Sequence, residues 1–276
     1  MALRIGTNIE SIFAQKMLAR TQRGIRESIT KLSSGSRITK AADDPAGLAI
    51  SQKMRAQIKS LKMAHRNTET GLSMVQTTEG ALMEVQDMLA RLRELAVEAS
   101  SEVLQSTERN YLQTEVIALQ EEIDRISSST EFNGLNLLDG STTSVDVQVG
   151  INATATSRIA VELFAADATS LQVGVGLVDL SNAATAQNSI DQVDLGIDMV
   201  NLMRAKFGAS QNRLTSAMRN LENYTENLVE AESRIRDVDF AEETAKLTRH
   251  QIFQQATISI LSQANSSPQA VLALLG

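Results

Sequence analysis

The stretch VDLGIDMVNLMRAKFGASQNRLTSAMRNLENYTENLVEAESRI, residues 193–235, decides the fold of this chain because an apolar side chain returns at every seventh position. The repeating residues are Val193, Val200, Phe207, Leu214, Leu221, Leu228 and Ile235. Heptads that continue without a gap are typical of long helices packed as coiled coils. The stretch therefore predicts one long helix that packs along a partner of similar length.

A second run with the same period supplies that partner. Its residues are Met54, Leu61, Thr68, Val75, Leu82, Leu89 and Ala96, accompanied by Ile58, His65, Leu72 and Glu79 and then by Val85, Leu92 and Ala99. A shorter run with spacings of four and three comprises Leu112, Val116, Leu119, Ile123 and Ile126. At a rise of 1.5 Å per residue, each long helix would extend roughly 75–80 Å. The sequence predicts a mainly α fold: an elongated antiparallel coiled-coil or helical-bundle rod.

Local signals mark where the helices begin and end. Gly35, surrounded by serines, breaks an N-terminal helix. Asp44 can then cap the next helix, with Pro45 at its first position. Asn133-Gly134 and Asp139-Gly140 are strong turn signals that follow the short heptad run. After these turns, SVDVQVG and RIAVELF alternate apolar and polar residues, which predicts a small β-hairpin element.

Both ends of the chain carry apolar side chains at helical spacing. The last 26 residues, 251–276, hold no charged side chain, and 11 of them are Gln, Asn, Ser or Thr. That segment is too polar to span a membrane, so packing against partner helices is the better interpretation, and we expect no membrane insertion. The residues predicted to pack in this way are Ile5, Ile9, Ile12, Phe13, Leu18, Ile25 and Leu32, together with Ile252, Phe253, Ile260, Leu261, Val271, Leu272 and Leu275.

Composition and motifs argue against an enzyme. The chain has no Cys, no Trp and 3% aromatic residues, which is poor material for a compact catalytic core. His65 and His250 stand far apart and no HExxH, GxSxG or Walker pattern occurs, so we predict no catalytic, cofactor or metal site. A net charge of −7 without a basic block makes nucleic acid an unexpected partner.

These signals predict three regions. Residues 1–40 with 240–276 form an inner layer of paired terminal helices. Residues 41–140 with 188–239 form the heptad rod, and residues 141–187 form a small β element on the outer surface of the rod.

The motifs resemble those of bacterial flagellin, in the order of that family. They are LSSGSRITKAADDPAGLAIS (32–51), RLRELAVEAS (91–100), EEIDRISSSTEFNGLNLLDG (121–140), ESRIRDVDFAEETAKLTRHQIFQQATISILSQAN (232–265) and PQAVLALLG (268–276). Many flagellins insert large outer domains in the middle of the chain, whereas here only about 50 residues separate NLLDG from the last long helix. The chain is therefore similar to a minimal, two-layer flagellin.

The resemblance implies a subunit that polymerises into the flagellar filament, the propeller for swimming. The filament is an open helical homopolymer outside the cell, so the partners would be the chain itself, an export chaperone, and the cap and hook–filament junction proteins. The start MALRIGTNIESIF lacks the apolar core of a secretory signal, which implies export without a cleaved Sec peptide. The alternatives are a hook–filament junction protein and another coiled-coil surface rod.

One segment also resembles the part of flagellin that Toll-like receptor 5 binds. Leu89, Arg91, Leu95 and Glu115 match that region, and the same surface would contact the next subunit in the filament. The competing interpretation is that Leu89 belongs to the heptad core and that Arg91 and Glu115 are merely solvated charges.

Overall fold

The computed structural model describes the backbone of residues 7–275 and the side chains of residues 7–266. The described chain is dominated by long helices, with two small antiparallel sheets. The helices are α1 (Ile9–Ser34), α2 (Pro45–Ala99), α3 (Ser106–Ser129), α4 (Ala183–Arg236) and α5 (Phe240–Leu275). The predicted fold class, mainly α with antiparallel packed helices, is confirmed.

The chain divides into two compact units, one of residues 1–58 with 227–276 and one of residues 59–226. Both divisions fall inside helices, because α2 and α4 continue without a break past residues 58 and 227. The three regions expected from the sequence, with boundaries near residues 40 and 240 and a β element at residues 141–187, stay a prediction.

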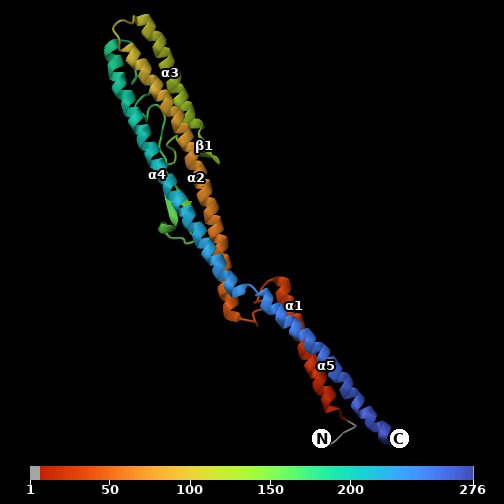
Figure 1. Ribbon diagram of the computed structural model, residues 1–276. Helices are drawn as coiled ribbons and strands as arrows, with labels where there is room; N and C mark the ends of the chain where they lie inside the picture. The colour runs from red at the N-terminus through yellow and green to blue at the C-terminus, as the bar shows by residue number, and fades with distance from the viewer. Residues whose placement is uncertain (1–6, 276) are drawn as a thin grey trace. The chain divides into compact units, whose positions relative to one another are not determined.

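In the second unit, α2 and α4 lie side by side and run antiparallel (Figure 1). Arg93 Nε donates to Asp194 Oδ1 at 2.6 Å, and Nε2 of His65 lies 3.1 Å from Oε1 of Glu222. From the first contact to the second, each helix advances by 28 residues, which is four heptads. The two heptad runs therefore face each other in register.

The heptad residues fill the core of this unit. Residues without exposed surface include Val75, Leu82, Leu89 and Ala96 on α2 and Val193, Val200, Phe207 and Leu214 on α4. His65 and Glu79, the two ionisable members of the α2 run, stay partly exposed, whereas Thr68 is buried. Burial of the apolar positions is what the period predicted.

The helix α3 and an irregular segment, residues 163–182, complete this core. Val116 and Ile123 of α3 are fully buried. The segment contributes Leu163, Ala166, Ala168, Leu171, Val173, Val178 and Leu180 as buried apolar residues. Its backbone bonds to α3: Gln120 Nε2 donates to the carbonyl of Val173 at 2.7 Å, and the amide of Ala168 donates to Asp124 Oδ1 at 2.8 Å. These bonds supply the partners that a buried irregular backbone needs.

Two hairpins form the β element. The strands β3 (Ser144–Gln148) and β4 (Arg158–Glu162) pair antiparallel, with Val145 opposite Val161 and Val147 opposite Ile159. The shorter strands β1 (Glu131–Phe132) and β2 (Leu135–Asn136) are joined through Asn133 and Gly134, whose φ angles are 53° and 77°. Two positive φ angles are what an Asn-Gly hairpin turn requires. The predicted strands and turn are confirmed.

The predicted helix ends are also found. Gly35, with φ 67°, adopts the left-handed conformation that ends α1. The helix α2 begins at Pro45, and Oδ1 of Asp44 accepts a hydrogen bond from the amide of Gly47 at 2.9 Å. Backbone bonds then join the turn after α1 to the turn before α5, from Arg37 N to the carbonyl of Arg236 and from Val238 N to that of Gly35.

Candidate assembly surfaces

The terminal helices α1 and α5 pair with each other in the first unit and run antiparallel (Figure 1). Asn8 caps α1 by accepting from the amide of Ser11 at 3.0 Å, and its Nδ2 donates to the carbonyl of Ala264 at 2.7 Å. Near the other end of α1, the hydroxyl of Ser28 donates to Oε1 of Glu243 at 2.6 Å. Polar bonds thus join the pair at both ends.

The surface where these two helices meet, here called the seam, is built from small or polar side chains. Its buried members are Ser11, Ala14, Thr21 and Ser28 on α1 and Glu243 and Ala264 on α5. Ala14, Thr21 and Ser28 are seven residues apart, as in a coiled coil. The carboxylate of Glu243 is balanced by Ser28 and by Lys246, whose Nζ lies 3.6 Å from Oε2. The pair therefore closes without burying its largest apolar residues.

Those larger residues face away from the seam. The set called here the outer apolar residues comprises Ile9, Ile12, Phe13, Ile252, Phe253 and Ile260, each more than half exposed. Exposure of so many large apolar side chains on one helix pair is unusual for a protein that acts as a monomer. The surface is therefore suited to contact other helices.

The sequence-predicted terminal residues divide between these two places. Leu18, Ile25, Leu32 and Leu261 are half-buried beside the seam, whereas the outer apolar residues are exposed. Ile5 lies outside the described residues, and so do the side chains of Val271, Leu272 and Leu275. Sequence reasoning missed Ser11, Ala14, Thr21 and Ser28, although a seven-residue spacing of small residues could have revealed three of them.

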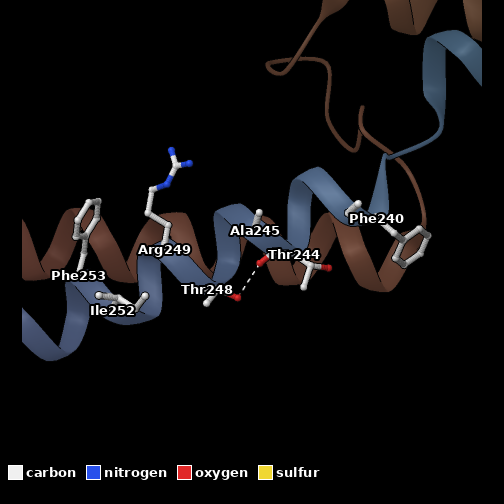
Figure 2. A pocket seen from close by; sticks show the side chains of 8 residues that line it. Phe240, Thr244, Ala245, Thr248, Arg249, Ile252 and Phe253 are labelled. Atoms are coloured by element: carbon white, nitrogen blue, oxygen red, sulfur yellow. Dashed lines mark hydrogen bonds between the residues drawn. The ribbon is translucent and has the colours of Figure 1, made fainter.

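A shallow hollow marks part of this exposed surface on α5. It is lined by Phe240, Ala241, Thr244, Ala245, Thr248, Arg249, Ile252 and Phe253 (Figure 2). Thr248 uses its hydroxyl within the helix, donating to the carbonyl of Thr244 at 3.0 Å. Apart from Arg249, the lining carries no charge. Phe240 was not predicted, yet it is 58% exposed and belongs to the same apolar surface.

The predicted receptor-contact residues lie on α2 and α3 of the second unit. Arg91 Nε donates to Oε1 of Glu115 at 2.8 Å, and its Nη1 donates to Oε2 of Glu94 at 2.9 Å. The hydrogen bond to Glu115, and then that to Glu94, raise the pKa of Arg91. Arg91 and Glu115 thus form an exposed pair that joins two helices.

Leu89 and Leu95 need a correction, because neither has any exposed surface. Both side chains point into the heptad core, where apolar burial stabilises the bundle. An outward contact through these two leucines does not fit the structure, and only Arg91 and Glu115 remain as contact candidates.

The described residues also contain neither a metal-ligand cluster nor a membrane-spanning helix. Among the described residues, no three His, Asp or Glu side chains come together as metal ligands would. No helix in the same residues combines the length and apolarity that crossing a membrane requires.

Comparison with known proteins covers both halves of the chain. Residues 5–143 match the family described as the bacterial flagellin N-terminal helical region, and residues 190–275 match the bacterial flagellin C-terminal helical region. A flagellin of Halalkalibacterium halodurans is 43% identical over 271 residues, covering 98% of this chain and 99% of that protein. A flagellin of Bacillus subtilis is 42% identical over 304 residues, covering 99% of this chain and all of that protein.

A solved structure is also similar. The crystal structure of Bacillus cereus flagellin is 32% identical, covers 56% of this chain and 88% of that one, and superposes with a TM-score of 0.50.

Proposed function

The chain belongs to the bacterial flagellin family, and from this premise we propose that the outer apolar residues of α1 and α5 are the surface through which its copies pack. It is a structural subunit of the flagellar filament, which serves motility, and not an enzyme. The filament is the extracellular part of the flagellum. The hook–filament junction alternative is not favoured, because relatives named flagellin match almost the whole chain.

The observation that supports this packing surface is the exposure of Ile9, Ile12, Phe13, Ile252, Phe253 and Ile260. Burying one Ile or Phe side chain contributes about 1.5–3 kcal/mol. Six such residues would supply a large driving force for association, whereas the seam of the same helix pair supplies little. A second copy of the chain is the occupant that fits, because self-polymerisation is what the family does.

The way in which identical copies associate follows from geometry. One face of a subunit can bind a different face of the next copy. When the rotation between successive copies does not close a ring, such contacts repeat and build an open helical filament. α1 and α5 each present exposed apolar residues, so one copy can offer both surfaces to its neighbours. This arrangement supports an open helical filament.

Substitution of one outer residue tests the proposal. We expect Ile12→Glu and Ile252→Glu to raise the critical concentration for growth on filament seeds about tenfold or more, because each 1.4 kcal/mol of lost burial is a factor of ten. Both side chains are 58% exposed, so circular dichroism of the monomer should not change. Ile12→Leu is the matched control and should polymerise normally. Growth of both glutamate variants at the wild-type concentration would refute the proposed surface.

Further partners are proposed from the family resemblance. We expect an export chaperone, a filament cap and hook–filament junction proteins to bind this chain, and export to proceed without a cleaved Sec peptide. The exposed pair of Arg91 and Glu115 supports a contact with Toll-like receptor 5 and with the neighbouring subunit.

A further inference from the structure

The helix α1 contains one glycine, Gly24, at a position where a glycine weakens a helix. A Cβ atom built on Gly24 would lie 2.7 Å from Cε1 and 2.8 Å from Nε2 of His250 on α5. Side chains do not approach a Cβ so closely. The imidazole of His250 thus occupies the space that any other residue at position 24 would fill.

His250 belongs to the seam and not to the outer side of α5. Buried or half-buried residues recur there every seven positions, at Glu243, His250, Thr257 and Ala264. The atoms nearest to that Cβ are the far end of the half-buried imidazole, so a methyl group at position 24 would first turn the ring out of this row. The two helices would move apart only where the ring has no room to turn. Either change removes contacts, because a well-packed surface tolerates added volume poorly.

The space at Gly24 that His250 fills, here called the notch, lies between the polar bonds that join the two helix ends. From Asn8 to Ser28, α1 advances by 20 residues, and from Ala264 to Glu243, α5 returns by 21. A shift of one heptad would bring His250 opposite Met17 or Lys31, where a long side chain fills the space. The small residues of the seam would by themselves allow such a shift. The imidazole of His250 does not, because only Gly24 leaves room for it on α1.

We infer that Gly24 and His250 form a contact that sets the register and close spacing of α1 against α5. The register in turn decides which apolar residues the pair presents to neighbouring copies, a step that rests on the proposed packing surface. Two other helical glycines serve as controls, because a Cβ at Gly80 on α2 or at Gly208 on α4 would meet no atom within 4 Å. Gly71 and Gly196 also have close neighbours, but these belong to the second unit and not to the seam.

Polymerisation on seeds provides the first test. Gly24→Ala should raise the critical concentration about tenfold, a ratio that corresponds to roughly 1.4 kcal/mol. Alanine is a better helix former than glycine, so the weaker polymerisation of Gly24→Ala cannot come from a less stable α1 helix. Gly80→Ala is the matched control and should polymerise as wild type does. The double variant Gly24→Ala/His250→Ala should return to within about threefold of His250→Ala alone, because the methyl group then has room.

Cross-linking reports the register directly and does not depend on assembly. The chain has no cysteine, so a designed pair is the only thiol pair present. Ser11 and Asn265 suit the purpose, because the Ser11 hydroxyl donates to Oδ1 of Asn265 at 3.0 Å. With both replaced by cysteine, mild oxidation of dilute monomers should give an intramolecular disulfide. Gly24→Ala should lower its yield severalfold, and adding His250→Ala should restore it.

The outcomes separate this inference from the proposed packing surface. The inference would be refuted if Gly24→Ala polymerised and cross-linked as the wild type does. It would also be refuted if adding His250→Ala restored neither polymerisation nor cross-linking. Loss of polymerisation with unchanged cross-linking would also overturn it, since Gly24 would then act between copies. Normal polymerisation of both Ile12→Glu and Ile252→Glu, by contrast, would refute the proposed packing surface and leave the cross-linking result unaffected.

Discussion

Arg91 is held by two carboxylates from two helices, Glu94 on α2 and Glu115 on α3. All three side chains are well exposed, so solvent screens the ion pairs and their effect on stability is small. The same exposure makes the guanidinium available to a partner, where an arginine often anchors an interface.

We therefore expect Arg91→Ala to weaken binding to Toll-like receptor 5 on the order of tenfold or more, while monomer melting stays nearly unchanged. Surface plasmon resonance and circular dichroism on the same variant measure the two effects. Arg93→Ala is a suitable control, because Arg93 is equally exposed and pairs with Asp194 instead. Equal binding by both variants would reduce Arg91 to a solvated charge, and a large melting shift would make it structural.

The helix α5 carries seam residues and outer apolar residues on one segment. Deleting residues 251–276 would remove Ile252, Phe253 and Ile260 from the outer set and Ala264 from the seam. We expect the truncated chain to form no filaments. The core of the second unit does not include this segment, so its helices should keep their circular dichroism signal. Filaments of the truncated protein in electron micrographs would contradict the prediction.

The elements that could be predicted from the sequence are those with local or periodic signals. Asp44 with Pro45, Gly35, and Asn133 with Gly134 mark ends and turns through their own side chains or φ angles. The heptads of α2 and α4 repeat often enough to identify both the helices and their buried faces. Such signals do not depend on distant parts of the chain.

Other features had no such signal. The segment 163–182 has no period, and its burial depends on bonds from Gln120 and Asp124 of another element. The sequence also did not separate the seam of α1 from its outer apolar residues. The seam residues Ser11, Ala14, Thr21 and Ser28 are small or polar, so they do not form an apolar stripe that a sequence pattern reveals. The match of Leu89 and Leu95 to a contact motif likewise could not show that both lie in the core. In each of these cases the outcome depends on which residues are buried, and that depends on the element that packs against them.

For the molecule as a whole, we expect the monomer to contain less helix than the filament. The seam buries small side chains, so in a single copy the α1–α5 pair forms but opens often, and it stays closed only when other copies cover the outer residues. Limited proteolysis of monomers should remove roughly residues 1–40 and 240–276, as expected for weakly held terminal segments. Filaments should resist cleavage at the same sites. Equal protection of both ends in monomer and filament would argue against this prediction.

The small residues of the seam also affect how the polymer responds to temperature. Apolar surface that is hidden on folding normally gives folding its large change in heat capacity. In α1 and α5 most of the apolar surface stays hydrated in the single copy and is buried only when copies associate. We therefore expect the large heat-capacity change to accompany polymerisation and not folding of the single copy. Because the force that drives apolar surface out of water weakens on cooling, cold would shorten these filaments while leaving the bundle of α2, α3 and α4 intact.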